Sequence, residues 1–254
     1  MKLLGGRQPG LVLRNLAAPA NYRALLEMPR RYPDLRDAAP RYLLGRGDYP
    51  TRVEVRTPLG VVRPKLWSHH DMFTLNEVFC RRDYAAGPGD RRVLDLGSNI
   101  GISALYFLTR GPEVCCRLYE PDPRNVERLR ENLRGFGDRY TLETVAVADF
   151  DGEADFGLSP SGRYGGLGVK SDSSTQVRCV HIDSVLEAAL ADWDAVDLLK
   201  IDVEGMEGRL LEVARPELLR QVATVYVEGR RHELPLPAGF DARERCETVR
   251  LRPR

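Results

Sequence analysis

The chain of 254 residues is long enough to bury a substantial core, as one large domain or as one domain with an appended segment. Its 38 Lys and Arg residues nearly balance its 37 Asp and Glu residues, and the net charge of +1 argues against a dedicated nucleic-acid or anionic-membrane binder. Five cysteines without CxxC spacing favour a reducing compartment, and the sequence has neither an apolar run of about 18 residues nor a signal-peptide core, so we expect a cytoplasmic protein with no membrane span.

The first 50 residues are predicted to form an N-terminal extension. Residues 1–50 are rich in proline and arginine and show only weak periodicity. A short helix is expected at 21–28, followed by an irregular connection at 29–50.

Residues 51–90 are predicted to lead into the core. Residues 51–67 alternate in polarity on both sides of the tripeptide Pro58-Leu59-Gly60, which predicts a hairpin. Residues 71–84 carry apolar side chains at helical spacing, and the Gly- and Pro-containing stretch that follows marks the boundary of the main domain.

The main domain is predicted to span residues 91–254. Strands and helices alternate here, which indicates an α/β fold with a doubly wound, mostly parallel sheet covered on both faces. The expected strands are 92–96, 114–120, 140–148, 196–202 and 221–229, and the expected helices are 99–108, 123–137, 183–191 (with Asp183 as N-cap) and 206–214.

Two segments depart from this alternation. Residues 150–180 are predicted to be a hairpin with a long Gly/Ser loop, either a lid in which Tyr164 stacks on a ligand or a disordered surface loop. After residue 232 we expect only one more strand, at 246–251, so that the terminal hairpin usual for such folds is cut short.

A glycine turn follows the first predicted strand. In "VLDLGSNIGISALYF" (93–107), Gly97 and Gly101 lie where the strand gives way to a helix. Neither the dinucleotide pattern GxGxxG nor a phosphate-binding P-loop is present. Asp95, just before the turn, would repel a pyrophosphate and suits a cation or an amino group. The turn therefore predicts a pocket for a cationic nucleoside rather than for phosphates.

A second acid follows the next predicted strand. In folds of this kind an acid at the position of Glu120 accepts hydrogen bonds from ribose hydroxyls. Together with Asp95 it favours S-adenosylmethionine, which carries a sulfonium and an ammonium group. The alternatives are an NAD-type oxidoreductase on a related fold and a non-catalytic S-adenosylmethionine-binding module.

Four sequence blocks resemble the FkbM family of S-adenosylmethionine-dependent methyltransferases over about residues 50–232. They are "VLDLGSNIGISALYF", "YEPDPRNVERLRENL", "HIDSVLE" and "LLKIDVEGMEGRLL", the last being the most specific. The resemblance implies the Rossmann-like class I methyltransferase fold and O-methylation of hydroxyls on sugars and natural products, including secondary metabolites.

The resemblance also implies positions for the cofactor. The methionine portion would contact Asp95, Gly97, Ser98, Asn99 and Gly101. The ribose would bind Glu120, with Pro121 beside it, and the adenine would lie against Ala146, Val147 and Ala148.

A hydroxyl acceptor has to lose a proton, so a base near the strand ends is expected. The candidate catalytic residues are Asp202, Glu204 and His232, with His69 or His70 as alternatives from the segment before the main domain. Each has a structural explanation as well, namely turn formation, helix capping or simple surface exposure.

A metal is the less favoured alternative to a protein base. Asp202, Glu204 and Glu228 together offer carboxylate ligands for Mg²⁺, which would lower the pKa of an acceptor hydroxyl. The expected partner is a small hydroxylated acceptor, and the family resemblance implies that it is glycosylated. The sequence does not indicate the identity of this acceptor or the oligomeric state of the protein.

Overall fold

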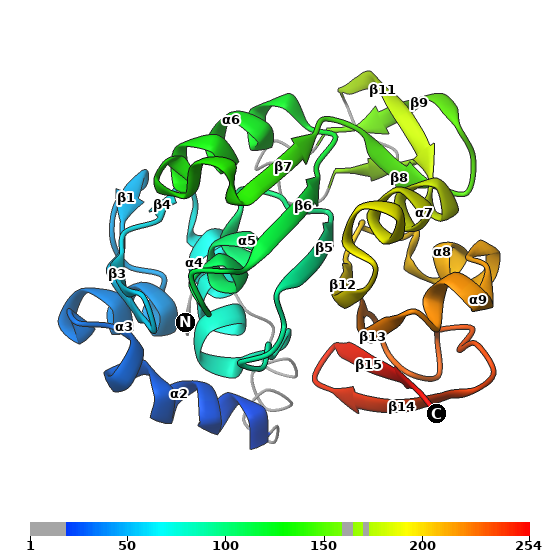
Figure 1. Ribbon diagram of the computed structural model, residues 1–254. Coiled ribbons are helices and arrows are strands. Elements are labelled where there is room, and N and C mark those ends of the chain that lie inside the picture. The colour runs from blue at the N-terminus through cyan, green and yellow to red at the C-terminus, as the bar shows by residue number, and fades with distance from the viewer. Residues whose placement is uncertain (1–18, 159–164, 170–172) are drawn as a thin grey trace. The chain divides into compact units, whose positions relative to one another are not determined.

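The computed structural model describes residues 19–158, 165–169 and 173–254 (Figure 1). The chain divides into two compact units, Met1–Ala85 and Ala86–Arg254. Tyr164, the residue proposed for the lid, lies outside the described residues. Among the described residues no helix has both the length and the apolar character needed to cross a bilayer.

The first unit begins with two helices, α2 (Pro19–Arg31) and α3 (Leu35–Leu44). The prediction of an irregular connection at 29–50 is therefore wrong for α3. Asp34 caps this helix by accepting a hydrogen bond from the amide of Asp37 at 3.1 Å, and Gly45 ends it in the left-handed conformation, with φ 65°. These caps compensate for Pro40, which lies inside the helix and lacks an amide hydrogen.

Short strands and a capped helix complete the first unit. The segment predicted as a hairpin contains two antiparallel pairs, β2 (Val55–Thr57) with β3 (Gly60–Val62) and β1 (Thr51–Arg52) with β4 (Lys65–Leu66). Helix α4 (His69–Asn76) follows and continues into a π-helical turn, η1 (Glu77–Arg81). Its N-terminus is fixed by a capping box between Ser68 and Asp71.

The second unit is built on a seven-stranded sheet in the order β14-β15-β13-β12-β5-β6-β7. The strands are β5 (Arg92–Leu96), β6 (Cys115–Tyr119), β7 (Tyr140–Glu143), β12 (Val196–Ile201), β13 (Val222–Glu228), β14 (Phe240–Arg245) and β15 (Thr248–Pro253). The five central and edge strands from β13 to β7 are parallel, and β15 is antiparallel to both of its neighbours. The predicted doubly wound, mostly parallel sheet is confirmed.

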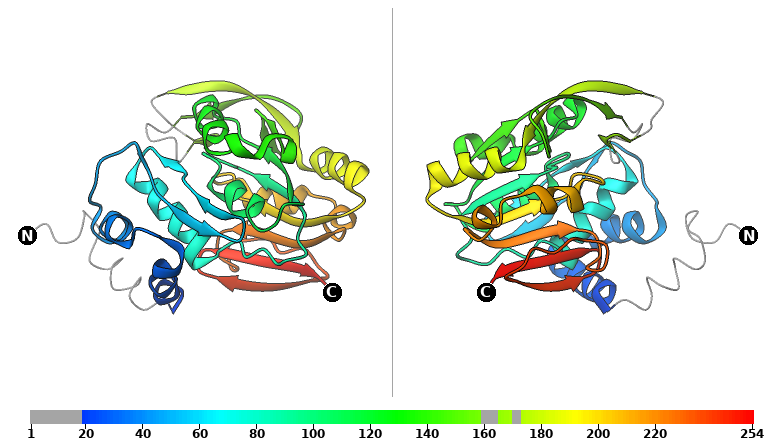
Figure 2. Two further views of the ribbon diagram at one scale, coloured as in Figure 1. Left: turned by 60° about the vertical axis from the view of Figure 1, so that its left-hand side comes forward. Right: turned by 90° about the vertical axis from the view of Figure 1, so that its right-hand side faces the viewer.

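Helices cover both faces because the chain winds outward from β5 in two directions. Helices α5 (Ile102–Leu108) and α6 (Pro123–Asn132) connect β5 to β6 and β6 to β7. Helices α7 (Ile182–Trp193), α8 (Glu207–Val213) and α9 (Pro216–Leu219) lie on the way to β12 and β13 and share one apolar core with those strands. In the right-hand view of Figure 2, α7 and α8 lie together on one face of the sheet.

Three helix boundaries differ from the prediction. Helix α5 starts at Ile102 because Asn99 and Gly101 have positive φ values of 48° and 84°. A 3₁₀ turn, η2 (Arg134–Arg139), replaces the end of the helix predicted to reach 137. Helix α7 is capped by the ring of His181, which accepts from the amide of the predicted cap, Asp183, at 3.1 Å.

The strand predicted at 140–148 is two strands. β7 stays in the main sheet, whereas β8 (Ala146–Ala148) turns away at a bend and joins a four-stranded sheet in the order β10-β9-β11-β8. In that sheet β9 (Gly152–Gly157) and β11 (Ser174–His181) form an antiparallel hairpin, with β10 (Gly166–Leu167) at the edge. The hairpin predicted at 150–180 is therefore part of a second sheet.

The C-terminal hairpin is complete, which corrects the expectation of a single strand. β14 pairs with β15 along its whole length, from Phe240 opposite Pro253 to Arg245 opposite Thr248. Most of the side chains of β14 are charged or exposed, as an edge strand tolerates, so its sequence lacks an apolar strand pattern.

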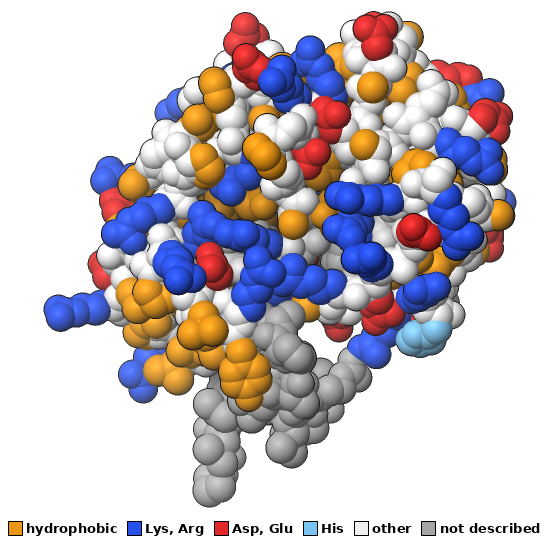
Figure 3. All heavy atoms as spheres, turned by 60° about the horizontal axis from the view of Figure 1, so that its bottom comes forward, with side chains coloured by type: hydrophobic (Ala, Val, Ile, Leu, Met, Phe, Trp, Pro, Cys, Tyr) orange, Lys and Arg blue, Asp and Glu red, His pale blue; other side chains and the backbone are white. Residues whose placement is uncertain are grey.

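Charged side chains of both signs reach the surface. On the face shown in Figure 3, Lys and Arg side chains form the larger groups, with Asp and Glu side chains among them. The small net charge of the chain thus coexists with local charge differences.

Candidate active site

The two glycines of the turn after β5 are needed for packing within the protein. Gly97 has φ 76°, and a Cβ atom there would come within 1.7 Å of the carbonyl oxygen of Asp202. Gly101 has φ 84°, and a Cβ atom there would lie 3.0 Å from Cγ of Leu129. The turn after β5 therefore packs directly on the segment after β12.

The amides of this turn are all hydrogen-bonded within the protein. Of the five amides of residues 97–101, the first two both donate to the carbonyl oxygen of Tyr119 at 3.0 Å, and the third donates to Oε2 of Glu120 at 2.7 Å. The last two bond within the turn at 2.8 and 2.9 Å. Because these five amides already donate to protein atoms, the turn does not offer them to a phosphate group.

Asp95 is fully buried at the centre of an ion-pair network. Its Oδ1 lies 3.0 Å from Nζ of Lys200 in β12, and its Oδ2 accepts a hydrogen bond from the hydroxyl of Ser103 at 2.6 Å. The predicted contact of Asp95 with a cofactor stays a prediction. In the structure both oxygens of the Asp95 carboxylate contact protein groups. Asp95 would therefore act on a ligand indirectly, by positioning Lys200 and the glycine turn.

Lys200 joins the ends of the two central strands. Only 2% of its side chain is exposed, and its ammonium group donates to the carbonyl oxygen of Gly97 at 2.9 Å and lies 3.2 Å from Oδ2 of Asp202. Burial lowers the pKa of Lys200, but the two carboxylates outweigh burial and raise it overall. We did not anticipate Lys200 from the sequence, although a lysine inside the apolar strand "VDLLKI" was a visible signal.

Glu120 lies at the end of β6, as predicted, and is nearly buried. It accepts from the amides of Asn99 and Asp122 at 2.7 and 3.0 Å and from the side-chain amide of Asn125 at 3.4 Å. Burial raises the pKa of Glu120 to about 7, although the two backbone hydrogen bonds act against this. A carboxylate has about four lone-pair positions, so one acceptor position is left for a further donor.

Two acids meet where β12 and β13 end. The neighbouring Asp202 carboxylate, followed by burial and a hydrogen bond with Asp202, raises the pKa of Glu228 to about 11. Glu204 and Glu207 add smaller contributions of the same sign. The raised pKa favours the protonated form of Glu228, while the adjacent ammonium group of Lys200 favours the negative charge on Asp202.

A third acid completes this cluster. Single oxygens of Asp202, Glu207 and Glu228 lie within 4.8 Å of one another, close enough to share a metal ion. Glu207 thus takes the place that the sequence suggested for Glu204, whose φ of 57° belongs to the turn. The two oxygens of Glu207 already accept from the amides of Val203 and Gly205, each at 2.9 Å, so Glu207 also stabilises this turn.

The other predicted site residues lie elsewhere. His232 is exposed and its Nε2 lies 3.5 Å from Oε1 of Glu233, outside the carboxylate cluster. His69 and His70 belong to the first unit, where the His69 ring stacks edge-on against Phe73 at 4.3 Å.

The residues predicted at the adenine and methionine positions are mostly buried. Ala146, Val147 and Ala148 form β8, and their side chains are at most 4% exposed. The hydroxyl of Ser98 donates to the carbonyl oxygen of Asp95 at 2.8 Å. Pro121 is half-buried between the acid of β6 and the cap of α6. Contacts from these residues to a cofactor remain predictions.

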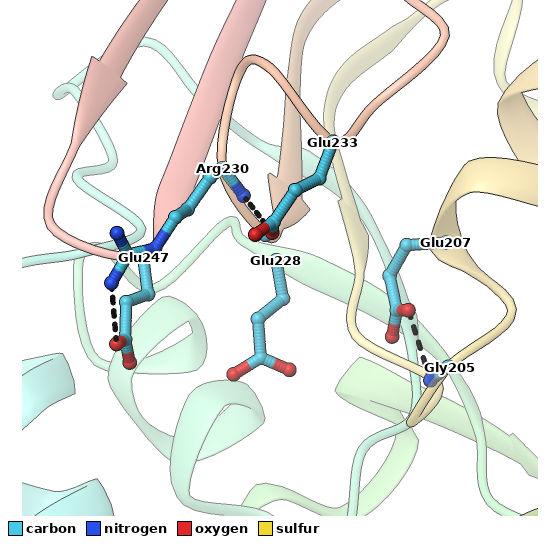
Figure 4. Close-up of a pocket in the computed structure, with 7 residues that line it drawn as sticks. Gly205, Glu207, Glu228, Arg230, Glu233 and Glu247 are labelled. Carbon is cyan, nitrogen blue, oxygen red and sulfur yellow. Dashed lines mark hydrogen bonds and ion pairs between the residues drawn. The ribbon is translucent and has the colours of Figure 1, made fainter.

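A pocket of about 270 Å³ opens beside the carboxylates (Figure 4). It is lined by Gly205, Glu207, Glu228, Gly229, Arg230, Glu233 and Glu247. In the close-up, Glu228 projects between Glu207 and Glu247, and Arg230 extends toward Glu247, at a distance of 3.9 Å. The sequence pointed to Glu228 but not to Glu233 or Glu247, because these two come together only through the fold of the C-terminal hairpin.

The strand order, the antiparallel strand next to the edge and the position of the acids after the central strands define a class I methyltransferase fold. Residues 95–243 match the family model described as the methyltransferase FkbM domain. The chain belongs to the FkbM methyltransferase family, and the resemblance predicted from the sequence is confirmed.

The chain is also similar to individual proteins. The chain is 31% identical over 186 residues to the 2-O-methyltransferase NoeI of Sinorhizobium fredii, covering 65% of this chain and 76% of that protein. It is 30% identical over 101 residues to the AMB antimetabolite synthetase AmbE of Pseudomonas aeruginosa, covering 39% of this chain and 5% of that protein. Solved structures include a methyltransferase from Geobacter sulfurreducens, with 16% identity, a TM-score of 0.38, and coverage of 65% of this chain and 72% of that chain.

Proposed function

We propose that this methyltransferase uses S-adenosylmethionine to methylate a hydroxyl group on a sugar or another natural-product small molecule. The observation that carries the proposal is the pair of carboxyl groups of Asp202 and Glu228, which lie within 4.8 Å of each other at the ends of adjacent parallel strands. The similarity to a 2-O-methyltransferase supports transfer to oxygen, and the pocket beside the pair supports a small acceptor.

The residues present fit S-adenosylmethionine by their chemistry. The turn at 97–101 offers no amide to a phosphate, Glu120 keeps an acceptor position for a ribose hydroxyl, and the cluster around Asp202 attracts positive charge. When bound, S-adenosylmethionine supplies an electrophilic methyl group on a positively charged sulfur.

The protein has two tasks in this reaction. It has to hold the acceptor oxygen in line with the methyl group, and it has to take the hydroxyl proton. Asp202 is the residue we assign to the proton, because Lys200 keeps its carboxylate charged and Glu228 hydrogen-bonds to it in protonated form. Asp202 would accept the proton of the acceptor hydroxyl as its oxygen takes up the methyl group.

The test incubates the protein with S-adenosylmethionine and a panel of glycosylated, hydroxylated acceptors. Mass spectrometry is expected to show an acceptor that gains one methylene unit. The Asp202→Asn variant is expected to bind S-adenosylhomocysteine normally, by calorimetry, while it loses most of its turnover. Binding of the cofactor without turnover of any acceptor by the unmodified protein would instead indicate a non-catalytic binding module.

A further inference from the structure

The pocket beside Glu228 lies toward the β13, β15 and β14 edge of the sheet, and the glycine turn follows β5, nearer the middle of the sheet. Its lining comes from the segments after β12 and β13 and from the turn between β14 and β15. β13 is two strands away from β5, or about 10 Å at the usual strand spacing. The residues proposed for the ribose and methionine lie after β5 and β6, so this pocket is on the acceptor side.

The charges in the pocket are unequal. Glu207, Glu233 and Glu247 each bring a negative charge, whereas Arg230 is the single positive group in the lining. The positive charge of Arg230 is also partly neutralised, because Oε1 of Glu247 lies 3.9 Å from its guanidinium. The lining thus favours a positively charged ligand and disfavours an anion.

The size and shape restrict the ligand further. The volume of about 270 Å³ lies just below the lower end of the range usual for drug-sized ligands, about 300 Å³, and suits one sugar ring. Gly205 contributes no side chain, and the space where its Cβ would lie is open. The carboxyl group of Glu228, beside Asp202, adds a hydrogen-bonding group suitable for a hydroxyl.

We propose that this pocket binds the methyl acceptor and selects one that carries an amino group near the reacting hydroxyl, with Glu233 and Glu247 recognising the ammonium ion. The inference rests on the proposed function for the identity of the reaction, but the charge preference can be measured by binding alone. An amino sugar is the ligand class that combines a ring of this size, a hydroxyl and a positive charge.

The test compares three ligands that differ only at one nitrogen. Methyl glucosaminide is cationic, its N-acetyl derivative is neutral, and its N-succinyl derivative is anionic. Their affinities are measured by calorimetry in the presence of saturating S-adenosylhomocysteine. We expect the amine to bind best and the N-succinyl derivative worst, with the preference shrinking at high salt because both glutamates are exposed.

Variants show whether the two glutamates cause the preference. Glu233→Gln and Glu247→Gln are each expected to weaken binding of the amine about two- to fivefold, the range for a partly exposed ion pair. Glu217→Gln, which removes an exposed glutamate of α9 outside the pocket lining, serves as the control and should change nothing.

The possible outcomes separate the two proposals. Equal affinities for the three ligands, tighter binding of the anion, or no binding of any of them would overturn the inference. Selective binding of the amine without methyl transfer would uphold the pocket assignment and count against the proposed function. Methylation without any charge preference would uphold the proposed function and count against the pocket assignment.

Discussion

Replacing Glu228 with glutamine should change how the stability of the protein depends on pH. Glu228 has a pKa raised to about 11 in the folded state, chiefly by Asp202, against about 4.3 in an unfolded chain. A raised pKa stabilises the fold below the unfolded value, and this stability is lost as pH rises toward the folded value. Around neutral pH the folded state therefore holds up to one more proton than the unfolded state.

The expected change in unfolding free energy with pH follows from proton linkage. One extra bound proton lowers the free energy of unfolding by up to about 1.4 kcal/mol for each pH unit. In the Glu228→Gln variant this contribution is absent, while the glutamine amide keeps a hydrogen-bond donor toward Asp202. The variant should thus gain stability relative to the unmodified protein as pH increases.

Urea unfolding followed by tryptophan fluorescence at about pH 6, 7 and 8 measures the effect. The difference in unfolding free energy between variant and unmodified protein should grow in favour of the variant across this range. The Glu217→Gln variant, altered at an exposed glutamate, should show the pH dependence of the unmodified protein. A pH-independent difference, or one that grows in the opposite direction, would refute the assignment of the proton to Glu228.

Three further predictions concern the same strand ends. Lys200→Met should lower the free energy of unfolding by about 3–5 kcal/mol, because it leaves the buried Asp95 without its partner, and adding Asp95→Asn should recover part of this loss in urea titrations. Gly97→Ala should greatly reduce the thermal midpoint or the soluble yield, since its Cβ would meet the carbonyl of Asp202, whereas Gly135→Ala, with nothing within 4 Å, should be tolerated. EDTA should leave methyl transfer unchanged, because the three-carboxylate cluster already has an ammonium group and backbone amides as partners; loss of activity that Mg²⁺ restores would contradict this.

Local sequence patterns predicted much of the second unit. Apolar strands that alternate with helices place Glu120 after β6 and Asp202 after β12, because the carboxyl ends of parallel strands share one edge of the sheet. The glycines at 97 and 101 identified the turn correctly. The reason that glycine is needed at position 97 differs from the prediction, because the carbonyl oxygen of Asp202, and not a ligand, excludes a side chain there.

Interactions between distant segments were beyond local patterns. The pairing of Lys200 with Asp95 depends on β12 lying next to β5, which the order of strands along the chain does not reveal. The pocket likewise depends on distant segments, because Glu247 from the last hairpin lines it together with Glu228 from β13. The split of the strand at 140–148 was also missed, because no glycine or proline marks the bend.

Charged segments were the other source of error. The strand β14 carries four charged residues and packs mainly through Phe240, so it lacks the alternation that predicts a strand. Helix α3 contains Pro40, which usually interrupts a helix, and its capping residues outweigh that effect. In both cases tertiary packing or capping decided the structure against the local propensity.

The atom that receives the methyl group decides whether this protein is an O-methyltransferase. S-adenosylmethionine labelled with ¹³C in its methyl group is incubated with the protein and an acceptor, and the product is examined by heteronuclear NMR. We predict that the labelled carbon appears as a methyl ether on a carbon that bore a hydroxyl, and that Asp202→Asn suppresses this signal. Label on nitrogen, or label retained entirely in the donor with every acceptor tested, would show that the protein does not methylate a hydroxyl.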